Sequence, residues 1–207
     1  TGTDVPVRSF RSFIDGHEET APDVEIDGSD LAQIMYTSGT TSMPKGVLLS
    51  NKAVHTGSRN VIANSDVTRH DTMGCVMPLF HCAQLTMVKG GLHVGAQTVI
   101  RRGFEPDQFL EDVEERRLSW SFLLPAMYKQ LLGRNDIEDR DFSSLDYCLY
   151  AMTPMGNETL KRGIEVFGAD FALGSGQTEA YPPTVIYQPE WQLDKQGNYW
   201  GTATANT

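Results

Sequence analysis

The 207-residue sequence has few cysteines and few basic residues, and it contains no long apolar run. Its three cysteines, Cys75, Cys82 and Cys148, lie far apart and lack the paired spacing of a zinc site, so we expect buried, reduced thiols typical of a cytoplasmic protein. No apolar stretch approaches the length of a transmembrane helix, so no membrane span is predicted. The 17 lysines and arginines against 27 aspartates and glutamates argue against a nucleic-acid-binding protein.

A hydroxyl-rich stretch at residues 36–47, YTSGTTSMPKGV, is the most informative part of the chain. The apolar-rich residues 31–36 before it predict a buried strand, and a helix is predicted at 51–63 after it. The stretch therefore reads as a loop between strand and helix, where α/β sheets bind ligands. Hydroxyl groups, glycine backbone and a lysine suit an anion such as phosphate. The residues predicted to contact it are Thr37, Ser38, Gly39, Thr40, Thr41 and Lys45.

This loop differs from the Walker phosphate loop. The Walker pattern has glycine directly before its lysine and serine or threonine directly after it, whereas here Pro44 precedes Lys45 and Gly46 follows it. An unrelated phosphate loop is therefore the better interpretation, and a plain serine-, threonine- and glycine-rich surface loop is the alternative.

Further along the chain, strand patterns alternate with helix patterns. This order predicts an α/β fold with a mainly parallel sheet and helices on both faces. Residues 1–29 are predicted to be an acidic connector from an upstream part, with a possible short strand near 5–13. Residues 30–190 are predicted to form the core. Residues 191–207 are predicted to be the truncated start of a following segment. Strands are predicted at 73–77, 97–100, 119–124, 146–150 and 171–173, and helices at 82–92, 106–117, 125–132 and 157–167.

Two more polar motifs follow predicted strands. His81 ends the sequence PLFH; a lone histidine on an apolar segment is more often a hydrogen-bonded core residue than a functional one. Residues 174–179, GSGQTE, combine two glycines that permit a sharp turn with Thr178, which can donate to a phosphate, and Glu179, which can ligate Mg²⁺.

Together the motifs resemble those of the adenylate-forming (AMP-binding) superfamily, and the chain looks like the centre of the large N-terminal domain of a fatty acyl-CoA synthetase. The match departs from the usual motifs at Ser42, where glycine is usual, and at Ser175, where an aromatic residue usually stacks on adenine. Tyr150 or Tyr181 are candidates to replace that ring.

The resemblance implies a ligase that uses ATP, Mg²⁺ and coenzyme A to activate a carboxylic acid, with small molecules as its partners. It implies catalytic roles for Lys45, His81 and Glu179, and Mg²⁺ ligation by Thr37 and Glu179. The remaining nucleotide-binding residues that it implies are Thr153, Pro154, Ser175, Gly176, Gln177 and Thr178.

We expect a fatty acid as substrate because the residues around His81 are small and apolar. An aryl or amino acid ligase and a non-catalytic nucleotide-binding module are alternatives, and the absent Walker spacing argues against a kinase or ATPase. The family's ribose-binding aspartate, hinge and lid domain do not occur in the sequence, so we expect these 207 residues alone to be inactive.

Overall fold

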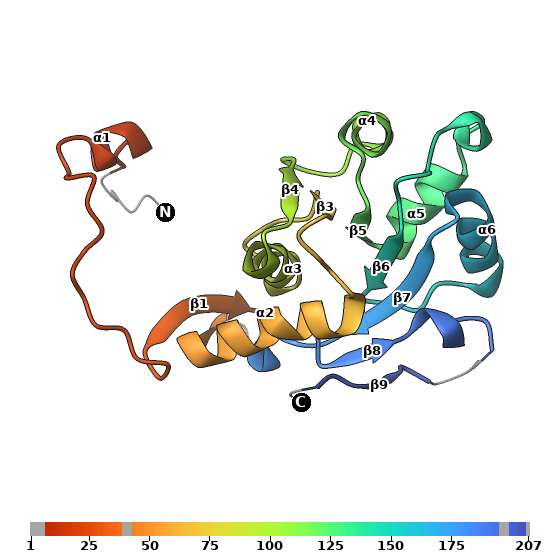
Figure 1. Ribbon diagram of the computed structural model, residues 1–207. Coiled ribbons are helices and arrows are strands. Elements are labelled where there is room, and N and C mark those ends of the chain that lie inside the picture. Colours follow the sequence, from red (N-terminus) through yellow and green to blue (C-terminus); the bar gives the residue numbers. More distant parts are fainter. Residues whose placement is uncertain (1–6, 39–42, 195–198, 206–207) are drawn as a thin grey trace.

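The computed structural model describes residues 7–38, 43–194 and 199–205. Within these ranges, a two-stranded antiparallel ribbon lies beside a seven-stranded sheet that carries helices on both faces (Figure 1). The sheet order is β4-β3-β5-β6-β7-β8-β9, with parallel pairing from β4 to β7 and antiparallel pairing from β7 to β9. The predicted α/β class with a mainly parallel sheet is confirmed. The strands are β3 (Thr72–Cys75), β4 (Gln97–Ile100), β5 (Trp120–Leu123), β6 (Tyr147–Ala151), β7 (Asp170–Ser175), β8 (Val185–Tyr187) and β9 (Thr202–Ala203).

Several helices begin where the sequence supplies a side-chain cap or a proline. The Ser50 side chain accepts a hydrogen bond from the backbone N–H of Ala53 at 3.2 Å and so caps α2. Pro106 and Pro125 occupy the first turns of α4 and α5, where a missing N–H costs nothing. The five helices around the sheet are α2 (Asn51–Ser65), α3 (Cys82–Val94), α4 (Pro106–Arg116), α5 (Pro125–Leu132) and α6 (Asn157–Phe167).

Each face of the sheet has its own apolar core. Val61 of α2 and Met87 of α3 pack with Phe122 and Leu149 on one face. On the other face, buried residues of α4, α5 and α6 pack together with Tyr187 and neighbouring strand residues. Successive strand residues point to opposite faces, so β5 and β6 supply both cores.

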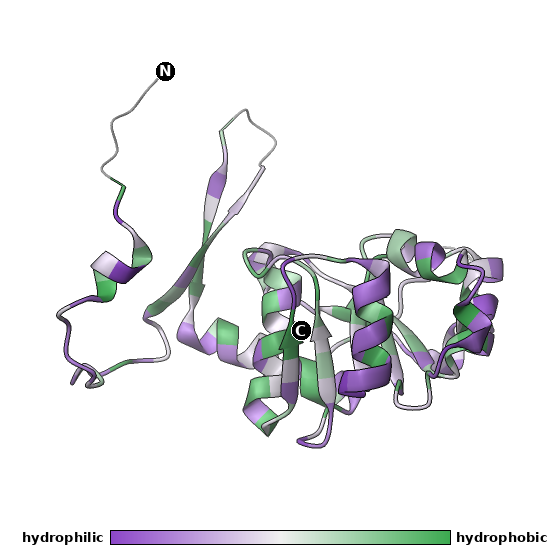
Figure 2. Ribbon diagram, turned by 90° about the horizontal axis from the view of Figure 1, so that it is seen from above, coloured by the Kyte–Doolittle hydropathy of each residue, from purple (hydrophilic) through white to green (hydrophobic). Residues whose placement is uncertain are grey.

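The hydroxyl-rich loop is not the strand–helix connection that the sequence predicted. β1 (Leu31–Thr37) pairs antiparallel with β2 (Lys45–Ser50), and β2 leads into α2. The strand predicted at 31–36 is present as β1, but its predicted burial is wrong, because Met35 is the one buried residue of β1. Successive side chains of the ribbon point to opposite faces, and Met35 packs with Leu49 in a small cluster on one of them. The rest of the ribbon extends beyond the sheet (Figure 2).

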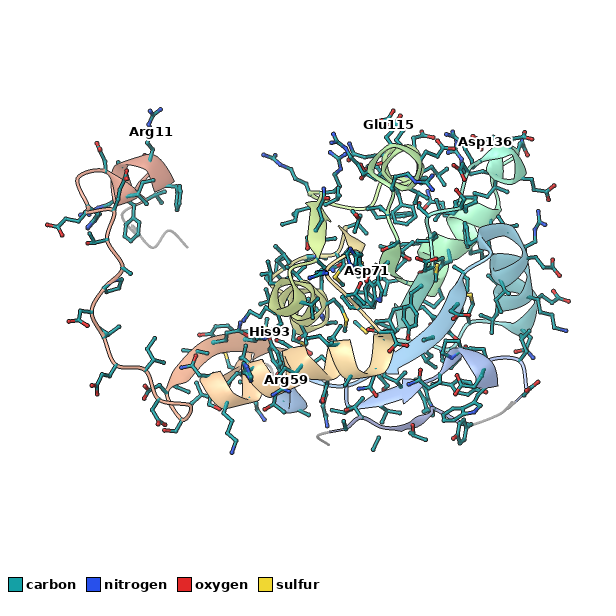
Figure 3. The ribbon with its side chains drawn as sticks, viewed as in Figure 1. Arg11, Arg59, Asp71, His93, Glu115 and Asp136 are labelled. Carbon is teal, nitrogen blue, oxygen red and sulfur yellow. The ribbon has the colours of Figure 1, made fainter. Side chains whose placement is uncertain are left out.

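The N-terminal segment makes little contact with the sheet. All described residues from 7 to 30 are exposed, and the only regular element there is the short helix α1 (Phe10–Ile14), not a strand. Ser9 caps this helix by accepting the backbone N–H of Ser12. Arg11 of α1 lies well away from the sheet (Figure 3).

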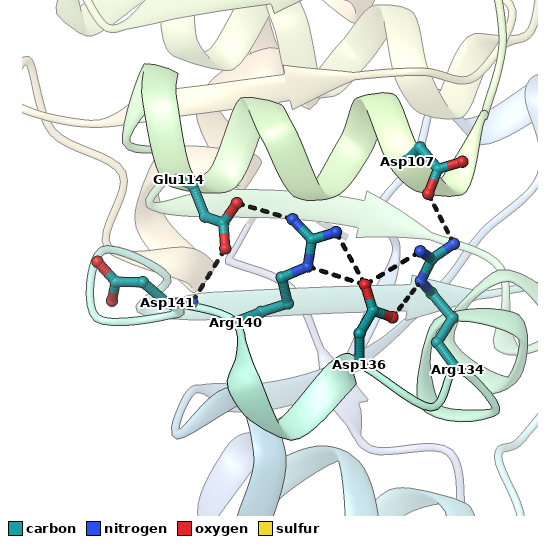
Figure 4. A network of polar contacts seen from close by, with 6 residues as sticks. All are labelled: Asp107, Glu114, Arg134, Asp136, Arg140 and Asp141. Atoms are coloured by element: carbon teal, nitrogen blue, oxygen red, sulfur yellow. Dashed lines mark hydrogen bonds and ion pairs between the residues drawn. The ribbon is translucent and has the colours of Figure 1, made fainter.

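Charged side chains fasten the segment after α5 to α4. Asp136 binds both Arg134 and Arg140 at 2.8 Å, Arg140 reaches Glu114 at 3.0 Å, and Arg134 reaches Asp107 at 2.7 Å (Figure 4). Hydrogen bonds from Arg134 and, to a smaller extent, from Arg140 hold the pKa of Asp136 well below its usual range. This segment therefore forms a paired network, and it contains the 3₁₀ helix η1 (Ile137–Asp139).

The three cysteines are free and buried, as predicted. Burial raises the pKa of the Cys75 thiol to about 11 and that of Cys148 to about 12, which keeps both protonated. Within the described ranges, every helix is too short or too polar to cross a bilayer.

Candidate active site

A cavity of about 560 Å³ opens at the carboxyl ends of the parallel strands. One end is polar and is formed by the end of β1, the start of α3, the end of β7 and the 3₁₀ helix η2 (Thr178–Ala180). The other end is apolar and follows the face of the sheet that packs on α2 and α3. The polar residues that line the cavity are Thr37, Ser38, His81, Ser175, Gln177, Thr178 and Glu179, and Gly176 lies among them.

The ribbon brings the hydroxyl-rich stretch to this cavity. Thr37 ends β1 and lines the cavity together with Ser38, and Lys45 stands opposite Thr37 in the strand register. Lys45 is exposed and does not line the cavity wall. The predicted contacts Gly39, Thr40 and Thr41, like Ser42, lie outside the described residues.

A small apolar cluster fixes the ribbon against α3 and η2. Met35 and Leu49 of the ribbon pack with Cys82, the first residue of α3, and with Tyr181, which follows η2. The Cys82 Sγ atom lies 3.3 Å from the Thr178 hydroxyl, so α3 and η2 also meet directly. Three segments that are distant in the sequence therefore converge on one end of the cavity.

His81 is an exposed residue at the start of α3, so it is not a buried core histidine. Its Nδ1 accepts the backbone N–H of Ala83 at 3.2 Å and caps the helix. An acceptor Nδ1 requires the tautomer that carries hydrogen on Nε2. His81 therefore presents an N–H donor to the cavity that it lines.

In the Gly174–Glu179 motif, Gly174 and Ser175 end β7, and the turn that connects β7 to η2 consists of Gly176 and Gln177. A Cβ atom on Gly176 would lie 2.5 Å from the Cβ of Pro182, so the turn has no room for a side chain there. The turn leads into η2, where Thr178 and Glu179 both line the cavity.

The turn after β6 reaches the cavity through different residues from those expected. Ala151 and Met152 line it, whereas Thr153 and Pro154 are exposed beside them and do not. Met152 has a φ angle of +77°, a conformation in which glycine is favoured.

Neither tyrosine considered as a substitute for the missing aromatic ring lines the cavity. The Tyr150 hydroxyl donates to Gln192 Oε1 at 2.7 Å in the interior, and the Tyr181 ring is buried beneath α2.

The apolar end is made of residues to which the sequence assigned no site role. Met87, Phe122 and Leu149 are each at most 3% exposed, and Trp200 completes this end of the wall, whereas Pro182 packs against Gly176. Alternation along β5 and β6 predicts buried residues, but it does not say which of the two faces holds the cavity.

The polar end carries oxygen groups of the kind that bind a magnesium nucleotide. Among the described residues, no group of three or more histidine, cysteine or acidic side chains could hold a metal ion. Mg²⁺ accepts one or two protein oxygens when phosphates supply the others. The Glu179 carboxylate and Thr37 hydroxyl, both in the lining, are oxygen ligands of that kind.

Comparisons with known proteins agree with this architecture. The model of the family described as AMP-binding enzyme matches residues 4–207. The chain is 29% identical to a feruloyl-CoA synthase of Amycolatopsis sp over 89% of this chain and 38% of that protein. It is 31% identical to 4-coumarate:CoA ligase 1 of Petunia hybrida, over 84% of this chain and 33% of that protein.

Among solved structures, the N-terminal domain of FACL13 from Mycobacterium tuberculosis superposes with a TM-score of 0.87 at 26% identity, covering 94% of this chain and 48% of that chain. The chain thus spans between a third and two fifths of the length of these curated relatives. The family match covers nearly all of its residues. The chain belongs to the AMP-binding enzyme family.

Proposed function

We propose that the whole protein that carries this chain joins a carboxylic acid to coenzyme A at the expense of ATP. The acid's carboxylate attacks the α-phosphorus of ATP, pyrophosphate leaves, and an acyl-adenylate forms. The thiol of coenzyme A then takes the acyl group and AMP leaves. The observation that carries the proposal is one cavity with hydroxyl, imidazole and carboxylate groups at one end and an apolar wall at the other.

Each polar group has a role that suits its chemistry. The Nε2–H of His81 donates to the substrate carboxylate, because its Nδ1 is engaged with Ala83. The hydroxyls of Thr37, Ser38 and Thr178 donate to phosphate oxygens. Mg²⁺, held by Glu179 and Thr37, would neutralise charge that develops on the leaving phosphates. Lys45, beside Thr37 in the ribbon, is proposed to add a positive charge nearby.

The nature of the acid is a separate question. The small, apolar surroundings of His81 favour a fatty acid, and the names of the feruloyl- and coumarate-specific relatives favour an aryl acid. Both acids place an apolar body beyond a carboxylate, as the cavity requires. The free, buried cysteines suit a reducing compartment such as the cytoplasm, and we propose that location.

The proposal is tested by acid-dependent exchange of labelled pyrophosphate into ATP, measured on the whole protein and on the 207-residue chain. We expect exchange in the whole protein and none in the chain alone. Glu179→Gln should lower the exchange rate about 100- to 1,000-fold, the usual cost of losing one electrostatic contact to the transition state. Glu165→Gln is the matched control, because Glu165 is exposed on α6 and does not line the cavity.

Other outcomes would contradict the proposal. ATP binding without exchange for any acid would identify a non-catalytic nucleotide-binding module. ADP as the product would identify a phosphotransferase.

A further inference from the structure

We propose that Trp200 closes the far end of the acid pocket and restricts the enzyme to compact acids, such as arylpropenoic or short-chain fatty acids. This inference rests on the proposed function. It concerns a residue outside the polar motifs, from the segment that leads into β9.

Strand register places Trp200 away from the polar end. Ser175 at that end pairs with Val185, the first residue of β8, and β8 runs from there toward the opposite edge of the sheet. A Cβ atom on Gly201 would lie 2.1 Å from the carbonyl oxygen of Ile186, so Gly201 lies against the peptide between Ile186 and Tyr187. Trp200 therefore lies two to three residues from the polar end, or about 7–10 Å at roughly 3.3 Å per residue.

The neighbouring rings show which face Trp200 occupies. The Tyr199 ring packs edge-on against Tyr187 at 5.2 Å and against Trp191 at 6.3 Å, on the core that contains α5 and α6. The indole of Trp200 instead lines the cavity together with Phe122 and Leu149, which belong to the core on the other face.

Trp200 differs from the other wall residues in its exposure, and we infer that its removal would lengthen the pocket. Phe122, Leu149 and Met87 are held in the core between the sheet and α3 and are at most 3% exposed. Trp200 is 41% exposed, so one side of its ring faces the cavity and another faces solvent. An acid whose carboxylate lies near His81 would reach the indole with its far end. A planar ring could contact it there, whereas a long alkyl chain would collide with it.

The test compares acids of different length in the pyrophosphate exchange assay with the whole protein. The panel contains 4-hydroxycinnamate, hexanoate and hexadecanoate, and the variants are Trp200→Ala and Trp200→Phe. For Trp200→Ala we expect kcat/KM for 4-hydroxycinnamate to fall about tenfold to a hundredfold, the effect of losing one buried aromatic contact. The ratio of hexadecanoate to hexanoate should rise at least tenfold. For Trp200→Phe, which keeps a smaller ring, both values should lie between those of the wild type and those of Trp200→Ala.

Tyr199→Ala is the matched control. Tyr199 is the adjacent aromatic residue and is 37% exposed, but its ring lies on the opposite face. It should leave the chain-length ratio unchanged even where it lowers stability. A wild-type enzyme that prefers hexadecanoate, or an unchanged ratio in both Trp200 variants, would overturn the inference and leave the proposed function standing. Absence of exchange with every acid in the wild type would overturn both.

Discussion

Gly57 lies in the middle of α2 at the point where this helix meets Tyr181, the residue after η2, so Gly57→Ala tests this packing. A Cβ atom at this position would lie 2.5 Å from Tyr181 Cδ1 and 2.6 Å from the Tyr181 carbonyl oxygen. Tyr181 is 1% exposed, and its N–H donates to the Thr178 carbonyl, so it cannot retreat without moving η2.

Two effects of opposite sign compete in this substitution. Replacing glycine by alanine inside a helix normally raises the free energy of unfolding by about 0.5–1 kcal/mol. Overpacking against a backbone atom lowers it by about 1–3 kcal/mol. Ordinary contact begins near 3.4 Å, so the Tyr181 backbone would have to shift by the difference between 3.4 and 2.6 Å, about 0.8 Å. We therefore expect Gly57→Ala to be destabilised by about 1 kcal/mol.

The same shift should reduce activity, because a displacement of about 1 Å at a catalytic group can lower the rate about 100-fold. Urea unfolding measures the stability and pyrophosphate exchange measures the activity. Gly103→Ala is the control, since a Cβ atom there meets nothing within 4 Å. If Gly57→Ala were as stable and as active as the wild type, Tyr181 would be free to move, and the coupling that we infer between α2 and η2 would be refuted.

Two further perturbations test local features. Met152→Gly should raise the free energy of unfolding by about 0.5 kcal/mol, because relief of left-handed strain of about 1–2 kcal/mol exceeds the entropic cost of glycine. Met152→Ala keeps the strain, so an equal rise in the free energy of unfolding for Met152→Ala would contradict this reason. The lowered pKa of Asp136 contributes stability that is present above the unfolded-state pKa of about 3.9 and is lost as the pH falls through the lower folded-state value. Asp136→Asn should therefore flatten the decline in stability below about pH 4, and an unchanged slope in acid unfolding would show that Asp136 is not its source.

The sequence predicted the helices and the parallel strands well because their limits carry local chemical signals. Pro125 begins α5 and Gly168 follows α6 with a φ angle of +63°, so both boundaries follow from the residue types. The positions of the polar motifs after predicted strands are also informative, since the carboxyl ends of parallel strands share one edge of the sheet. The cavity brings together His81 and the turn that carries Glu179 on that basis.

The ribbon and the apolar wall were not predictable in the same way. The residues of β2 alternate between buried and exposed positions over only a few residues, next to a loop whose composition predicts irregular structure. β8 has three residues and pairs antiparallel, although βα alternation upstream predicts parallel pairing. The side chains that line the cavity depend on which helices cover which face of the sheet. Residue types and local periodicity do not contain that information.

Under the proposed function, the distribution of rings in the cavity distinguishes how the nucleotide and the acid would be bound. Ser175 leaves the polar end without the aromatic residue usual in the family motif, and Tyr150 and Tyr181 are both buried elsewhere. The rings of Phe122 and Trp200 lie instead toward the apolar end. Stacking contributes about 0.5–1.5 kcal/mol beyond the burial of area. Under the proposed function, a nucleotide would be held chiefly through its phosphates and an acid would gain its affinity from the rings, so specificity for the acid would depend on the shape of the apolar wall.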